Sequence, residues 1–172
     1  WLRDVAVLPP DAVANHLSLI AVGLTVGPAL SGFAAEAARR SGLSLLALLG
    51  VMAFLYMAVQ TMIVLEWTSI SYLLWAVFGL LINAMALSYA ILSQAFDRSL
   101  AGRVNTNLNM LMIGFAFASQ FLVGWIIEFW PLTSGGGYAP ESYQVGFGIL
   151  LATQVAAFVW FLLGCYSTGR TA

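Results

Sequence analysis

Side chains that could do chemistry are few in this sequence, and the most conspicuous are amides embedded in apolar runs. Asn83 lies in the charge-free stretch 67–96, and Gln120 lies in the charge-free stretch 104–127. Polar groups are costly inside a bilayer and usually face protein or water. Each amide is therefore expected either to contact a small polar substrate or to form a hydrogen bond to a neighbouring helix. The residues alone leave both roles open.

Three further side chains are candidates for substrate contact. Tyr72 shares one 3.6-residue face with Asn83. Asn109 lies in the same stretch as Gln120 but nearer its start, where helix capping and a gate contact compete. His16, the only histidine, lies near the start of another apolar stretch, where a solvated or structural role competes with proton relay.

Nothing in the sequence predicts an enzyme, a metal centre or a cofactor. There is one His and one Cys, and no nucleophile–base pair or metal-ligand cluster appears. All six basic residues are Arg and the net charge is −1, so no basic face is expected for nucleic acid. No charged residue lies in the middle of an apolar stretch, so a symporter would need His16 or a group outside these 172 residues for proton coupling.

The elements that must position these residues are membrane helices. Hydrophobic residues make up 62% of the chain and charged residues 8%. The charge-free stretches 12–35, 41–65, 67–96, 104–127 and 142–169 each exceed the roughly 20 residues that one bilayer crossing needs. We predict an all-α integral membrane protein, one domain over residues 1–172, with helices at about 13–35, 44–65, 70–95, 104–129 and 143–166. Asp11 is the expected N-cap of the first helix.

The arginines predict the orientation of the chain, because cytoplasmic loops carry an excess of basic residues. One set of alternate loops and the C-terminal tail hold five of the six: Arg39, Arg40, Arg98, Arg103 and Arg170. The opposite side has only Arg3. We therefore expect the N-terminal end outside and the C-terminus in the cytoplasm.

The first predicted helix combines small residues with a charged end. Gly23 and Gly27 have the small-xxx-small spacing that lets a neighbouring helix approach closely, either as a fixed contact or as a sliding one. Beyond them, the loop motif consists of Gly32, Glu36, Arg39 and Arg40. This motif is expected at the cytoplasmic end of the helix, leading into the next span.

The loop motif resembles the one that the major facilitator superfamily repeats after the second helix of each half. Gly32, Glu36 and Arg40 match that pattern, whereas Ala37 stands where a basic residue is usual and Arg39 where Gly is common. The segment 96–103, followed by Asn105 and Asn109, is similar to the junction of the tenth and eleventh helices in bacterial metabolite permeases. Residues 1–4 look like the outer end of the seventh helix, and the five predicted spans look like the eighth to the twelfth.

The resemblance implies a secondary active transporter, a permease of the bacterial inner membrane that moves a small polar metabolite by alternating access. It also implies that the eighth, tenth and eleventh helices face the substrate cavity and that the ninth and twelfth are more peripheral. The partners would be the lipid bilayer and the missing N-terminal helices or another membrane subunit. The alternative is a transporter-like remnant that serves as a structural or assembly subunit of a larger membrane complex.

Overall fold

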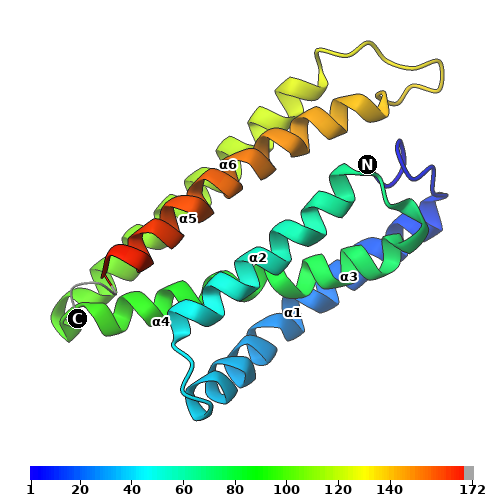
Figure 1. Ribbon diagram of the computed structural model, residues 1–172. Helices are drawn as coiled ribbons and strands as arrows, with labels where there is room; N and C mark the ends of the chain where they lie inside the picture. The colour runs from blue at the N-terminus through cyan, green and yellow to red at the C-terminus, as the bar shows by residue number, and fades with distance from the viewer. Residues whose placement is uncertain (169–172) are drawn as a thin grey trace.

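The part of the chain that the structure describes, residues 1–168 of a computed structural model, is built from helices (Figure 1). The elements are α1 (Pro10–Arg40), α2 (Leu45–Val64), η1 (Thr68–Ile70, a 3₁₀ helix), α3 (Ser71–Leu81), η2 (Ile82–Met85, 3₁₀), α4 (Ala86–Ala95), α5 (Arg98–Ile127) and α6 (Pro140–Thr168). One isolated antiparallel bridge joins Leu132 and Tyr138 in the loop between α5 and α6. The predicted all-α class is confirmed.

Five segments are long and apolar enough to cross a membrane, as predicted. They are Pro10–Arg40, Leu45–Val64, Thr68–Ala95, Arg98–Ile127 and Pro140–Cys165. Only 6% to 25% of the most apolar part of each segment is buried inside the protein. Most of the helix surface therefore faces outward, which suits a membrane protein whose helices meet lipid or further helices.

The charged end of α1 is helical, whereas the sequence predicted a loop there. The helix runs to Arg40 because the alanines around Glu36 are strong helix formers and Glu36 pairs with Arg39 and Arg40 at i,i+3 and i,i+4 spacing. It ends where Gly42 adopts a positive φ of 77°. The Gly42 N–H then donates to the Arg39 carbonyl, and the Leu43 N–H donates to the Ala38 carbonyl, which together form a Schellman cap.

Three helices begin earlier than the sequence predicted. Pro10 and Pro140 occupy the first positions of α1 and α6, where the fixed φ of proline suits a helix and its missing N–H costs nothing. Pro9 is the N-cap of α1, so the expected Asp11 cap is wrong, and Asp11 lies in the first turn instead. α5 begins at Arg98, because the Asp97 carbonyl already accepts two backbone hydrogen bonds from the next turn.

The third span changes from an α-helix to a short 3₁₀ helix in its middle, and this local irregularity is the interruption referred to below. The sequence predicted one continuous helix over 70–95, but η2 separates α3 from α4 and contains Asn83. A short 3₁₀ segment inside a helix commonly marks a hinge or a local constraint. Here the constraint is the contact of this segment with α1, since the Asn83 side chain bonds to a carbonyl of α1 at this point.

The closest helix contact is the crossing of α1 and α3. Gly23 and Gly79 face each other so closely that a Cβ added to Gly23 would lie 2.6 Å from the carbonyl carbon of Gly79. A Cβ added to Gly79 would lie 2.8 Å from the Ile20 carbonyl oxygen. The predicted close approach at Gly23 is confirmed, and its partner is Gly79 on the third span.

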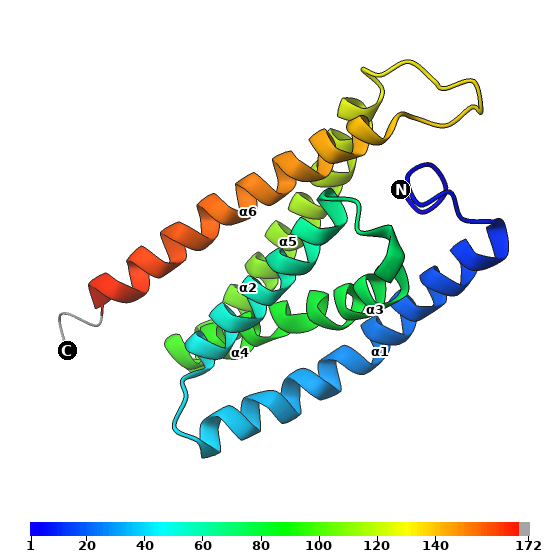
Figure 2. The ribbon, with the colours of Figure 1, turned by 45° about the vertical axis from the view of Figure 1, so that its right-hand side comes forward.

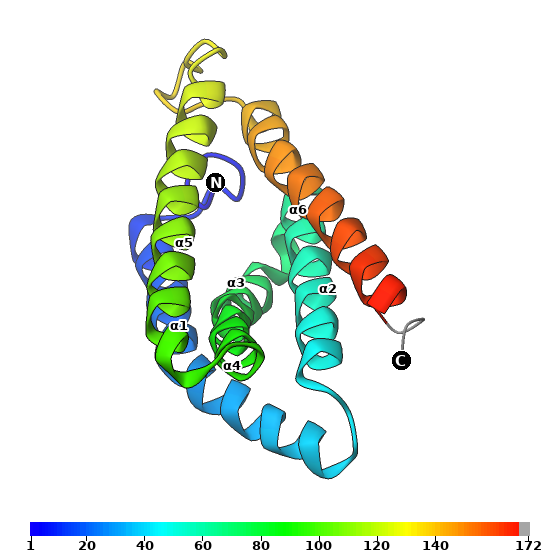
Figure 3. The same cartoon turned by 90° about the vertical axis from the view of Figure 1, so that its left-hand side faces the viewer.

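α6 links the remaining helices, because it packs against both α2 and α5. α2 packs against α3 and α6, and α5 packs against α4 and α6. Figure 2 shows α1 and α3 side by side, and Figure 3 shows α5 and α6 meeting near their connecting loop and separating towards the other end. A small core of Val59, Ile63 and Leu74 joins α2 to α3, with Trp1 and Trp75 packed against it.

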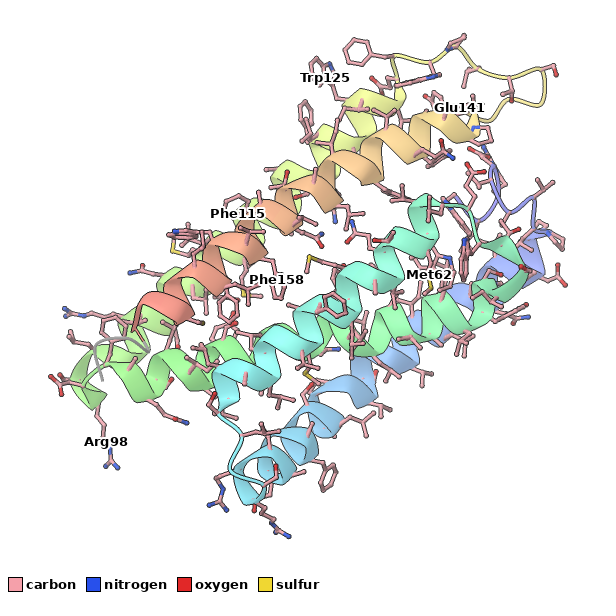
Figure 4. All side chains as sticks on the ribbon, viewed as in Figure 1. Met62, Arg98, Phe115, Trp125, Glu141 and Phe158 are labelled. Carbon is pink, nitrogen blue, oxygen red and sulfur yellow. The ribbon has the colours of Figure 1, made fainter. Side chains whose placement is uncertain are left out.

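Alternate connections lie at opposite ends of the bundle, as expected for consecutive spans. Residues 1–8, the α2–α3 connection and the α5–α6 loop lie at one end, and the α1–α2 and α4–α5 connections lie at the other (Figure 1). Arg98 projects from that second end in Figure 4, the end at which α1 presents Arg39 and Arg40. Arg170, which the sequence analysis assigned to the same side, lies outside the described residues.

Candidate functional site

Asn83 lies at the interruption of the third span and is bonded to α1. Its Nδ2 donates to the Leu24 carbonyl oxygen at 3.1 Å. A Cβ added to Gly27 would lie 2.7 Å from the same Nδ2, so the glycine leaves room for the amide. The sequence left two roles open for Asn83, substrate contact and a hydrogen bond to a neighbouring helix. The structure shows the hydrogen bond, from Asn83 to α1.

His16 and Tyr72 lie together at the end of the bundle that carries residues 1–8. His16 is fully buried, and its ring stacks on Tyr72 with 3.8 Å between centroids. The His16 Nδ1 is 2.7 Å from the Ala12 carbonyl oxygen, and its Nε2 is 3.0 Å from the Ser71 hydroxyl. Because a carbonyl oxygen only accepts, Nδ1 donates to Ala12, whereas the direction of the bond between Nε2 and the Ser71 hydroxyl depends on the tautomer and protonation state of the ring. Full burial excludes the solvated role and fits a structural one.

Polar side chains of α4 and α5 pair with one another near the other end. The Tyr89 hydroxyl donates to Oδ1 of Asn109 at 3.0 Å, and Nδ2 of Asn105 donates to the Ser93 hydroxyl at 2.8 Å. The Oδ1 of Asn105 is buried and has no hydrogen-bond partner. The asparagines were predicted as candidates, whereas Tyr89 and Ser93 were not, although their i,i+4 spacing in an apolar span was a usable signal.

The candidate substrate residues lie at several separate places in the described part of the chain. His16 and Tyr72 form one pair, Asn83 lies further along the same span, Asn109 joins α4 to α5, and Gln120 is exposed on α5. A hollow of about 400 Å³ lies elsewhere, between α2, the interrupted span and α6. Its wall is mainly apolar, with Tyr56, Ser88 and Gln154 as the polar side chains of its lining.

One polar side chain of α2, the helix expected to be peripheral, is buried. Gln60 on α2 is 6% exposed, and its Oε1 has no hydrogen-bond partner. The Nε1 of Trp75 is likewise buried without a partner. A lone glutamine in an apolar span was the only signal for this feature, and α2 packs against both α3 and α6 to cover it.

The loop motif forms a compact ion-pair cluster on the last turns of α1. The Glu36 carboxylate accepts from Nε and Nη2 of Arg39, at 3.0 and 2.9 Å, and from Nε of Arg40 at 2.8 Å. Gly32 has no atom within 4 Å of where its Cβ would lie, so its small size is not required by a contact inside the described chain. A hollow of about 620 Å³ adjoins Gly32, Glu36 and Arg39.

A second polar cluster, at the opposite end, was not predicted. Asp4 accepts a hydrogen bond from the Tyr143 hydroxyl at 2.6 Å, from the Tyr138 N–H at 3.2 Å and from Nε of Arg3 at 2.9 Å. Burial alone would raise the pKa of the Asp4 carboxyl, but these hydrogen bonds outweigh burial and lower that pKa from 3.8 to about 2. Asp4 thereby fastens residues 1–8 to α6 and to the loop that precedes it.

Comparisons of this chain with protein-family models, with curated proteins and with solved structures find no match. Any likeness to a transporter family therefore rests on the residues quoted from the sequence. The geometry adds an independent set of facts: an interrupted span, a close helix crossing and two polar clusters at opposite ends of the bundle.

Proposed function

We propose that this chain is part of a secondary active transporter that moves a small polar metabolite by alternating access. The observation that carries the proposal is the interrupted third span. Substrate sites in many transporters lie near the bilayer midplane where a membrane helix is discontinuous. Here the helix changes locally to a 3₁₀ segment, η2, between α3 and α4, and Asn83 lies in that segment.

The packing of the helices supports a relationship to the major facilitator superfamily. In the proposed correspondence, α1 is the eighth helix, α2 the ninth, α3–α4 the tenth, α5 the eleventh and α6 the twelfth. The eighth and tenth would then be the pair that crosses at Gly23 and Gly79. The polar pairs join α1 to the third span and α4 to α5, which are the elements proposed to face the cavity.

A transporter of this kind needs a second half, and the exposed side chains support a missing partner. Gln120 lies exposed on α5 within an apolar span. Lipid offers an amide no hydrogen-bond partner. We propose that further helices, either encoded before Trp1 or supplied by another subunit, cover this face.

The proposed orientation places residues 1–8 and the α5–α6 loop outside the bacterial inner membrane and the ends of α1 and α6 in the cytoplasm. Cys165, near the end of α6, tests it with an impermeant thiol reagent on intact cells. A Gly136→Cys variant, with Cys165 replaced by Ser, should label from outside, because Gly136 lies in the exposed α5–α6 loop. The parent chain should not label. The reverse pattern would invert the orientation.

Transport is tested with the chain expressed together with its proposed partner helices in cells, using a panel of labelled sugars, amino acids and organic acids. Saturable uptake of one class, lost in Asn83→Ala at an unchanged membrane level, supports the proposal. The chain alone in liposomes is expected to transport nothing. Stable co-purification with unrelated membrane subunits, without uptake, would favour the alternative, an assembly subunit of a larger complex.

A further inference from the structure

We propose that the hollow beside the charged end of α1 holds the headgroup of an anionic phospholipid. This arginine hollow has a volume of about 620 Å³. Its polar lining includes Glu36, Arg39, Ser44 and Gln94, and its apolar lining includes Leu43, Leu46 and Ile91. The proposal rests on the helices crossing a membrane and does not depend on the transport proposal.

The depth of the hollow matches that of lipid headgroups. α1 has 31 residues, which at a rise of 1.5 Å each give a length of about 46 Å, well beyond the roughly 30 Å of the bilayer core. Arg39 and Arg40 are its last two residues, and α2 begins at Leu45 after a short turn. The hollow therefore lies where a helix leaves the hydrocarbon and phosphate groups begin.

The charge of the cluster favours an anion. One carboxylate, that of Glu36, faces two guanidinium groups, so the cluster keeps one net positive charge; Arg39 lines the hollow, and Arg40 follows it in the sequence. The two arginines use three of their ten N–H donors on Glu36. Their side chains are 74% and 77% exposed, which leaves the other donors free to meet a phosphodiester. Arginine recognises phosphate through such paired N–H groups.

The apolar part of the lining distinguishes a lipid from a soluble phosphate. Leu43 is 58% exposed and Leu46 is 38% exposed, and both lie beside the polar residues of the hollow. A free phosphate ion would gain nothing from this apolar surface. The glycerol backbone and upper acyl chains of a phospholipid would cover it while the phosphate meets the arginines. Basic pockets at the ends of membrane helices bind anionic headgroups in this way.

The test measures lipid retained by the purified chain in detergent, using native mass spectrometry with phosphatidylglycerol and phosphatidylcholine of identical acyl chains. The parent chain is expected to retain phosphatidylglycerol preferentially. Arg39→Gln with Arg40→Gln is expected to lower that preference by about tenfold or more, because each arginine contributes separately to binding an anionic lipid. Arg39→Lys with Arg40→Lys keeps the charge and should keep most of the preference.

The matched control is Arg98→Gln with Arg103→Gln, which removes the same charge from the same end of the bundle without changing Arg39, the arginine that lines the hollow. This pair should keep the preference for phosphatidylglycerol, with helical content unchanged in every variant by circular dichroism. Equal loss in both pairs would overturn the proposal in favour of unspecific charge attraction. Displacement of the lipid by glycerol phosphate at an equal concentration would also overturn it, because the apolar lining would then contribute nothing.

Discussion

The crossing of α1 and α3 gives the sharpest test of the fold, through Gly79→Ala. The new methyl carbon would lie 2.8 Å from the Ile20 carbonyl oxygen and 2.9 Å from the Ile20 Cα. Both neighbours are backbone atoms, so no side-chain rotation can relieve the clash. The two helices would have to separate until the distance reaches about 3.4 Å, where ordinary van der Waals contact begins.

The size of the effect follows from three contributions. Overpacking of this kind costs about 1 to 3 kcal/mol, and a rigid backbone neighbour favours the upper value. Separation of the helices also weakens the Asn83–Leu24 hydrogen bond, for which membrane proteins give about 0.6 kcal/mol on average. Alanine regains about 1 kcal/mol of helix propensity over glycine. Gly79→Ala is thus expected to lower the free energy of unfolding by about 2 kcal/mol.

The matched control is Gly114→Ala on α5, where a Cβ would have no neighbour within 4 Å. It gains the same propensity without a clash and should stabilise the protein by up to about 1 kcal/mol. Unfolding of the purified chain in mixed micelles, titrated with sodium dodecyl sulfate and followed by circular dichroism, measures both variants. Equal stability of the two would show that α1 and α3 do not approach as closely as described.

Three further predictions test other parts of the molecule. Glu66 lies two residues beyond the end of α2 and has a positive φ of 57°, which costs a non-glycine residue about 1 kcal/mol. Glu66→Gly should therefore raise resistance to unfolding, whereas Glu66→Ala, which removes the same carboxylate, should not. The pKa of Asp4 is lowered from 3.8 to about 2, so residues 1–8 should stay bound to α6 above about pH 4 and be released as the pH falls towards 2. Pepsin should then cleave residues 1–8 more readily at the lower pH. Asp4→Asn should abolish this pH dependence. Asn83→Ala should cost about 0.6 kcal/mol of unfolding free energy in the same micelles, whereas Gln120→Ala, at an exposed position, should cost nothing; equal losses would contradict the bond between Asn83 and α1.

The number and order of the spans could be predicted from the sequence because they depend on composition alone. Long apolar runs separated by charged residues have one favourable arrangement in a bilayer, whatever they pack against. The small-residue spacing at Gly23 likewise predicted a close approach without revealing its partner. That partner, Gly79, shares a 3.6-residue face with Tyr72 and Asn83, but nothing in the sequence pairs it with Gly23, and only the packed arrangement of α1 and α3 identifies it.

The helix ends and the break in the third span could not be predicted because they depend on specific bonds. α1 continues past the apolar run because Glu36 bridges Arg39 and Arg40, an effect that a count of apolar residues misses. The interruption at η2 coincides with a bond from Asn83 to an α1 carbonyl 59 residues away. An amide in an apolar run predicts that some partner exists, and leaves the identity of that partner to the packing.

The bond between Asp4 and Tyr143 joins residues 139 positions apart, and it could not be predicted from the sequence either. It also bears on how the helices can move relative to one another. Trp1 donates from its indole N–H to the Ile63 carbonyl of α2 and packs against Trp75 of α3. Asp4, three residues later, accepts the Tyr143 hydroxyl of α6 at 2.6 Å. Residues 1–8 therefore join two groups of helices at one end of the bundle. Rocking that separates α6 from α2 and α3 at this end would strain this link, which would yield either at the Trp1 contacts or at the bond between Asp4 and Tyr143.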